Sequence, residues 1–289
     1  RLKRTGNRLM EVVGGRAVHP VNVRVGGFYS APTPATLGAL GDELRRARDD
    51  ALATVDWVAG FDFPDVERDY RFVALRSSDG YPIESGTVAV SDAGTLSLAE
   101  FASRAREEHV AHSTALHARL DGGAYLTGPL ARFALNADQL PPLARQAALA
   151  AGLTAPCRNP FRSVVVRSVE LAVACEEALR LVESYEPPDP PHVEPDWMAG
   201  TGYGATEAPR GMLLNVFELD AHGNILSARI MPPTAQNQES IEDDLRRLVA
   251  DRLHLDDGTL TSLCERAVRN HDPCISCATH FLDVTVTRR

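Results

Sequence analysis

Cysteine is scarce in this sequence, and long apolar runs are missing from it. The 289 residues include five cysteines, an odd and low number that disfavours a disulfide scaffold and favours a thiol or metal-binding role. No apolar run approaches the roughly 18–20 residues that span a bilayer. Residues 1–15 also lack the apolar stretch and cleavage site of a secretory signal. We therefore expect a cytoplasmic protein without a membrane span.

An excess of basic charge is absent as well. Lys and Arg number 30 against 39 Asp and Glu, which gives a formal net charge of -9. A protein that mainly binds nucleic acid would need a clustered basic face, so the charge balance argues against that class. Hydrophobic residues at 44% and charged residues at 24% are typical of a globular protein that can bury a substantial core.

The hydrophobic pattern predicts an α+β fold that is predominantly helical with two β-hairpins. Helical spacing of apolar residues and matching end signals predict helices over residues 33–59, 98–118, 143–151, 159–185, 239–253 and 258–270. Strand patterns around turn residues predict hairpins over 71–91 and 212–230, with turns at Asp79-Gly80 and at His222-Gly223-Asn224. Nothing indicates alternating βαβ units.

A metal-binding pattern stands near the C-terminus, where Asp272-Pro273 precedes Cys274, Cys277 and His280. Asp followed by Pro is typical of a helix start, and a helical turn there would place the three side chains on one face. Thiolates near a helix N-terminus are stabilised, and two of them one turn apart can bind a single soft metal ion.

Taken alone, this cysteine pair leaves two other interpretations open. It could be half of a zinc site, although Cys157, Cys175 and Cys264 are isolated and supply no second pair. It could also be a thioredoxin-like redox motif, but that motif belongs near the start of a βαβ unit.

A histidine cluster also invites a metal interpretation. His109, His112 and His117 lie in the predicted helix 98–118, but they lack the Glu of an HExxH motif. A solvated helix face is the better interpretation.

Four blocks occur in one order along the chain, and together they carry a resemblance. They are residues 14–20 (GGRAVHP) followed by Gly26-Gly27, residues 207–211 (EAPRG), Pro233-Thr234 with Asn237, and the terminal DPCxxCxxH. This order resembles that of nickel–iron hydrogenase large subunits. Residues 158–188 are also similar to a long helix in the cytoplasmic, cofactor-reducing branch of that family. The resemblance implies a hydrogenase large-subunit-like fold across residues 1–289.

The resemblance implies a nickel–iron centre with carbon monoxide and cyanide on the iron. Cys274 would be the terminal nickel ligand and first proton acceptor, and Cys277 would bridge nickel and iron. His280 matches a residue after which the family's maturation protease often cuts, and which often helps to hold a structural divalent ion such as magnesium.

The same resemblance implies roles around the metals. Arg210 would lie over them as a fixed cation, and Asp272 would lie beside Arg210 and tune it. Pro233 and Thr234 would contact the cyanide ligands, with Thr234 donating a hydrogen bond. Without the family, Arg210 would be a surface residue of a turn and Thr234 a capping residue.

One expected block is missing from these residues. The family uses four cysteines, two of them from an N-terminal RxCGxC block, and this sequence has no cysteine before Cys157. We therefore expect residues 1–289 to be the C-terminal part of a truncated large-subunit domain and to be inactive alone. Whether residues 281–289 are a cleaved peptide or a genuine terminus is left open.

The function implied is reversible oxidation of H2 to protons and electrons. The expected partners are an iron–sulfur small subunit, diaphorase-type NAD(P)-reducing subunits and a maturation protease. The alternatives are a non-catalytic relative similar to the quinone-binding subunit of the respiratory NADH dehydrogenase complex, or a zinc or redox CxxC protein.

Overall fold

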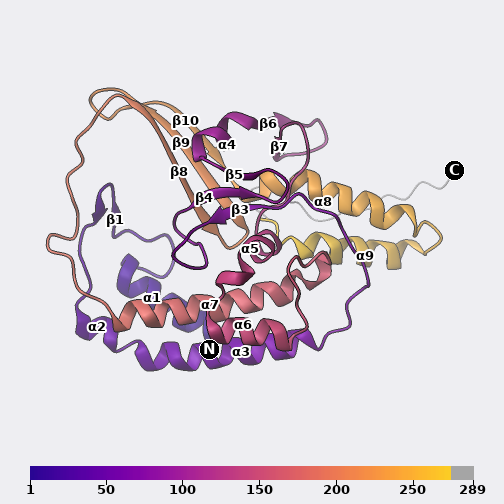
Figure 1. Cartoon of the computed structure of the whole chain (residues 1–289), viewed down its shortest axis with the longest axis horizontal. Coiled ribbons are helices and arrows are strands. Elements are labelled where there is room, and N and C mark those ends of the chain that lie inside the picture. The colour runs from indigo at the N-terminus through magenta and orange to yellow at the C-terminus, as the bar shows by residue number, and fades with distance from the viewer. Residues whose placement is uncertain (275–289) are drawn as a thin grey trace.

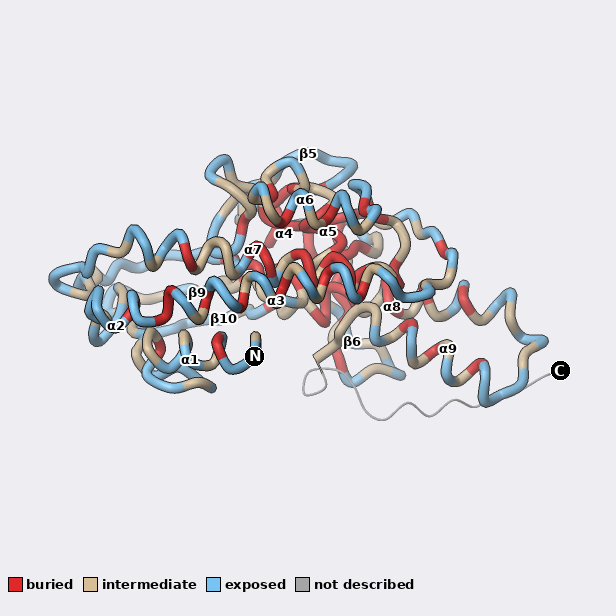
Figure 2. Tube along the Cα trace, turned by 90° about the horizontal axis from the view of Figure 1, so that it is seen from below, coloured by how far each residue is buried: buried red, intermediate tan, exposed pale blue. Residues whose placement is uncertain are grey.

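The computed structural model describes residues 1–274. Long helices run along one side of an elongated molecule, small sheets lie against them, and a helical hairpin extends at one end (Figure 1). Buried residues gather in the middle, where the helices meet the sheets (Figure 2). Within residues 1–274, no helix combines the length and the apolar character that crossing a bilayer requires.

The helical layer is built around α3 (Gly41–Ala59) and α7 (Ser163–Glu183), which pack along each other. Asn159 and Pro160, predicted to start the long helix itself, start instead the 3₁₀ turn Pro160–Arg162, which Asn159 caps and which leads into α7. The remaining helices of this layer are α1 (Leu2–Gly14), α2 (Pro34–Gly38), α5 (Pro129–Asn136) and α6 (Pro142–Ala150); the 3₁₀ turn Ala137–Gln139 follows α5.

Both predicted hairpins are present, and each gains a third strand. The first sheet contains β3 (Val73–Arg76), β4 (Thr87–Val90) and β5 (Gly94–Leu96). The second contains β8 (Gly200–Ala208), β9 (Gly211–Leu219) and β10 (Ile225–Met231), with β9 in the middle. A small pair, β1 (Val23–Arg24) and β2 (Gly27–Phe28), lies near the N-terminus. The α+β, mainly helical fold class is therefore confirmed.

The predicted helix over residues 98–118 is wrong in its second half. Helix α4 covers only Leu98–Arg104, and an antiparallel pair follows, β6 (Ala105–His109) with β7 (Leu116–Leu120). A capping box between Ser97 and Glu100 fixes the start of α4. After Ala105 the helical apolar stripe does not continue, and the residues pair as strands in which β7 buries His117, Ala118 and Leu120 while β6 is mostly exposed.

Helices α8 (Pro233–Ala250) and α9 (Asp257–Asn270) form the hairpin at the end of the molecule. Helix α8 begins six residues before the predicted start at 239, and its first three turns bury polar side chains. The buried polar residues of α8 are Thr234, Gln236, Asn237, Ser240 and Asp244. Gln236, for example, donates to the carbonyls of Met212 and Met231 and accepts from the hydroxyl of Tyr125. These side chains satisfy buried groups of the sheets.

Replacing Gln236 by Leu tests this polar packing. The substitution keeps the volume similar but leaves two buried carbonyls without their donor, so we expect a loss of about 1–3 kcal/mol in the free energy of unfolding. Denaturant titration measures the change. Gln238→Leu on the same helix is the matched control, because Gln238 is only half-buried, and it should shift stability by no more than about 0.5 kcal/mol. Equal effects of the two substitutions would contradict the assignment.

Candidate metal centre

Arg210 lies at the tip of a tight turn. Strands β8 and β9 are joined by Pro209 and Arg210 alone, since Ala208 pairs with Gly211. The turn packs directly on Gly128, where an added Cβ would lie 2.6 Å from the carbonyl oxygen of Arg210. Gly211 has a φ of +139°, and a Cβ there would lie 2.5 Å from Cγ2 of Thr127. These two glycines therefore permit the close approach that fixes the turn.

The buried side chain of Arg132 fixes the same turn through hydrogen bonds. Arg132 on α5 donates to both carboxylate oxygens of Glu170 at 2.7 Å and to Glu207 at 2.9 Å. It also donates to the carbonyls of Ala208 and Pro209, each at 2.9 Å. Burial alone would lower the pKa of Arg132, but the charges of Glu170 and Glu207 outweigh it and hold the pKa well above its usual value.

The N-terminus of α8 contacts the Arg210 turn as well. Asn237 accepts from the backbone N–H of Thr127 at 2.8 Å and donates to the carbonyl of Arg210 at 3.4 Å. The buried Thr234 hydroxyl accepts from the backbone N–H of Cys274 at 3.3 Å. The first turn of α8 thus contacts both the Arg210 turn and the cysteine segment, and its dipole favours negative charge there.

Asp272 contacts Arg210 through both its backbone carbonyl and its carboxylate. The Arg210 Nε donates to the backbone carbonyl of Asp272 and lies 3.4 Å from its Oδ2. Both side chains are partly exposed, at 40% and 47%, so their ion pair orients the guanidinium more than it stabilises the fold. The backbone of Asp272 is left-handed, with a φ of 47°. Burial lowers the pKa of nearby Arg167, and Asp272 partly offsets that effect.

The chain just before Asp272 is tied to α8. The ring of His271 is buried and its Nε2 lies 3.0 Å from Oδ2 of Asp244. Asp244 also accepts from Arg68 at 3.1 Å and from the hydroxyl of Tyr70. Burial, reinforced by the Asp244 charge, raises the pKa of Tyr70, which keeps this hydroxyl a donor. The C-terminal end of α9 is thereby fixed close to the candidate site.

The structure brings together four of the residues singled out in the sequence, Arg210, Thr234, Asp272 and Cys274, and places Pro233 at the start of α8. Asp272 to Cys274 are not helical. Cys277 and His280, and with them any helix after Cys274, lie outside the described residues.

Sequence reasoning missed other parts of the site. The supporting residues Arg132, Thr127, Asp244 and His271 were not singled out. The sequence did offer one signal for this supporting group. Arg132 is a charged residue inside the apolar segment Leu130–Leu135, and a buried arginine requires partners.

Substituting Gly211 by Ala tests the close approach at the Arg210 turn. The added methyl collides with Thr127 and Gly128 and also strains a positive φ. Gly94→Ala is the matched control, because Gly94 has a φ of +74° but nothing within 4 Å of the added Cβ. We expect Gly211→Ala to be about 1–3 kcal/mol more destabilising than Gly94→Ala in denaturant titrations. If the two variants lose equal stability, the contact does not constrain the turn.

Comparisons with known proteins agree on one family. Sulfhydrogenase 1 subunit alpha of Pyrococcus furiosus is 30% identical over 286 residues, which cover 98% of this chain and 67% of that protein. Sulfhydrogenase 2 subunit alpha of the same organism is 25% identical over 301 residues, covering 97% and 66%. The beta subunit of the NAD-reducing hydrogenase HoxS from Cupriavidus necator is 31% identical over 178 residues, covering 55% and 35%. No family model matches the chain.

Solved structures show the same fold. A structure described as NAD+-reducing [NiFe]-hydrogenase in the H2-reduced state matches with a TM-score of 0.79 and 21% identity, covering 96% of this chain and 67% of that one. The Ni-Fe-Se hydrogenase of D. vulgaris Hildenborough matches with a TM-score of 0.69 and 20% identity, covering 96% and 68%. This chain thus spans about two thirds of the length of its relatives. From the relative that is 30% identical across nearly the whole chain, together with the shared fold, it follows that this chain belongs to the nickel–iron hydrogenase large-subunit family.

Proposed function

We propose that this chain is the C-terminal part of the catalytic large subunit of a nickel–iron hydrogenase, which oxidises H2 reversibly to two protons and two electrons. The observation that carries the proposal is the position of Cys274. Its backbone is held by Thr234, in a segment whose Asp272 pairs with Arg210. Family membership implies a nickel–iron centre, and these residues hold the segment that carries the cysteine expected to bind it.

The residues fit such a centre chemically. Cysteine thiolates are the soft ligands that nickel and iron accept, and Cys274 and Cys277 have the spacing of a chelating pair. Cyanide ligands on the iron would need hydrogen-bond donors. Among residues 1–274, only Nε of Arg210 is engaged, so its two terminal amino groups remain as donors, and Thr234 can still donate its hydroxyl proton.

Each side chain has a separate role in this proposal. Cys274 would be the terminal nickel ligand and its sulfur would accept the first proton, and Cys277 would supply the second thiolate that holds the metals. The centre, when bound, supplies the place where the H–H bond is broken. Arg210 is a cation already fixed by Asp272, so it can stabilise developing negative charge without reorganising. The iron would carry carbon monoxide and cyanide, Pro233 and Thr234 would contact these ligands, and His280 would help to hold a magnesium ion.

The proposed partners follow from the relatives. Proteins similar to this chain include subunits of NAD-reducing hydrogenases, so we propose an iron–sulfur small subunit and diaphorase-type NAD(P)-reducing subunits as the route for electrons. A maturation protease acting near His280 and a cytoplasmic location complete the proposal.

Cysteine substitution in the full-length protein, purified with its partner subunits, tests the ligand assignment. Cys274→Ser and Cys277→Ser each remove a thiolate, so we expect loss of nickel by elemental analysis and loss of H2 uptake. Cys175→Ser is the matched control, since Cys175 packs against the apolar core and should leave both unchanged. Zinc alone in the wild-type protein would instead favour a zinc or redox CxxC protein, and retention of nickel in Cys274→Ser would contradict the assignment.

The number of cysteine ligands allows a second test of the proposal. Residues 1–289 offer one chelating pair where the family uses four cysteines. We propose that the 289-residue polypeptide expressed by itself does not activate H2. Hydrogen uptake by that polypeptide alone would overturn this part of the proposal without affecting the family assignment.

Arg210→Lys tests the role of the guanidinium. Lysine keeps the positive charge but loses the fork of donors, so H2 oxidation should fall by roughly 10²–10³-fold, the usual cost of a lost preorganised donor, while nickel and iron contents stay the same. Arg269→Lys, on the exposed face of α9, should leave the rate unchanged. Parallel losses of rate and of metal in Arg210→Lys would mean that Arg210 acts in assembly of the centre and not in the reaction.

A further inference from the structure

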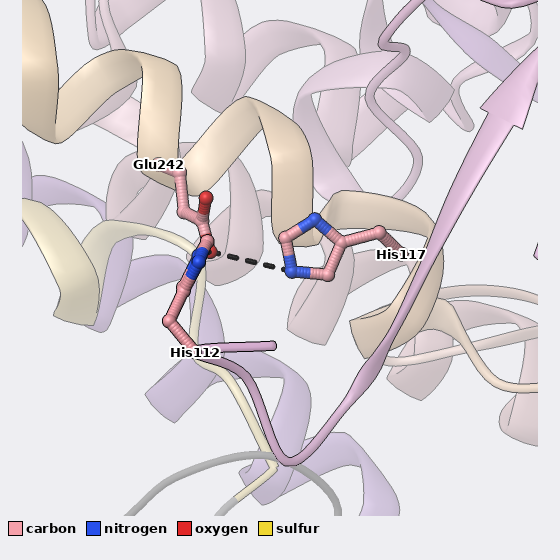
Figure 3. Close-up of side chains that lie close together, drawn as sticks. All are labelled: His112, His117 and Glu242. Atoms are coloured by element: carbon pink, nitrogen blue, oxygen red, sulfur yellow. Dashed lines mark hydrogen bonds and ion pairs between the residues drawn. The ribbon is translucent and has the colours of Figure 1, made fainter. Parts of the chain in front are cut away.

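Two histidines and a glutamate, none of them part of the candidate metal centre described above, lie close together. His112 lies in the loop between β6 and β7, His117 lies on β7, and Glu242 lies on α8. Figure 3 shows the three side chains converging from these separate elements. Their nitrogen and oxygen donor atoms all lie within 4.8 Å of one another. The strand pair that replaces the predicted helix places His117 on β7, and β7 packs against α8, which carries Glu242.

We propose that His112, His117 and Glu242 bind a divalent first-row transition metal ion of the zinc type. Two imidazoles and one carboxylate are a ligand set that zinc accepts, with a fourth position left for water. The imidazoles make a hard ion such as magnesium a poor fit. None of the three residues is among the nickel–iron ligands proposed above.

The distances fit ligands that share one ion. Nε2 of His112 and Nε2 of His117 lie 3.0 and 3.3 Å from the same atom, Oε1 of Glu242. Two ligand atoms bound tetrahedrally to one zinc ion at its usual bond lengths are roughly 3.3 Å apart. The two rings are nearly perpendicular, with centroids 5.9 Å apart, so neither ring stacks over the other.

His117 supplies the second, independent sign of a ligand. Its side chain is only 3% exposed, and its Nε2 makes no hydrogen bond of acceptable geometry although it points toward Glu242. A buried ring nitrogen without a well-formed hydrogen bond is costly, and a metal ion in front of it would remove that cost.

The charge balance around Glu242 favours a bound cation. Glu239, one turn earlier on α8, is already paired with Arg119 at 2.8 Å. Within residues 1–274, by contrast, Glu242 pairs with no lysine or arginine and faces only the two imidazoles. His112 is 66% exposed, which gives an ion a path from solvent and leaves space for a water ligand. A bound ion would join the tip of the β6–β7 hairpin to α8.

Zinc titration of the full-length protein against a chromophoric chelator, combined with X-ray absorption of the zinc-loaded protein, tests the proposal. We expect one zinc ion per chain with imidazole and oxygen ligands and no sulfur, which separates this site from any cysteine-bound zinc. His112→Ala and Glu242→Gln should each weaken zinc binding by at least about tenfold, an amount that even an outer partner of a metal ligand commonly contributes. His112 is exposed, so its variant should fold normally.

His109→Ala and Glu239→Gln are the matched controls, because they alter the neighbouring histidine and the neighbouring carboxylate and should leave zinc affinity unchanged. Zinc should also raise the melting temperature of the wild-type protein but not of His112→Ala. Zinc bound only through sulfur, no zinc bound, or equal affinity in wild type and His112→Ala would each overturn the proposal.

Discussion

The site depends on one buried cation, Arg132. All five of its N–H groups are used, by two carboxylates and by two carbonyls of the β8–β9 turn. One of those carboxylates, on Glu207, also accepts from the backbone N–H of Leu75 in β3. A single guanidinium therefore links α5, α7 and both three-stranded sheets. Lysine offers only three donors and no planar fork, so it could not occupy this position. Removing such a partner leaves buried carboxylates uncompensated, at a cost of about 3–5 kcal/mol.

Helix α8 continues this organisation toward the cysteine segment. Its buried polar face bonds to backbone groups of the Arg210 turn, of Thr127 and of Cys274, while Asp244 holds the end of α9. A polar face is unusual for a packed helix, and it places directional bonds where apolar packing would allow small shifts. The partly exposed pair of Arg210 and Asp272 is thus attached to elements that directional bonds hold in place, as a site that needs fixed charges requires.

Particular elements show why sequence reasoning succeeds in some places and fails in others. Helix α7 was predictable, because Asn159 and Pro160 mark the 3₁₀ turn that leads into it and an apolar stripe follows. The start of α8 was not, because its buried residues are polar and leave no apolar period to detect. The predicted helix 98–118 was wrong after Arg104, where pairing with β7 decided the structure. The candidate site residues came from ordered motifs, but the contact of Cys274 with Thr234 spans 40 residues and depends on tertiary packing.

The order of the chain has a consequence for how the site is assembled. Cys274 contacts Thr234, Asp272 contacts Arg210, and His271 contacts Asp244, so residues 271–274 follow all of these partners in the sequence. These four residues are therefore synthesised after every partner that they contact. Their contacts can form only once the Arg210 turn and the first turns of α8 have themselves been made, so this part of the site joins elements that precede it in the chain.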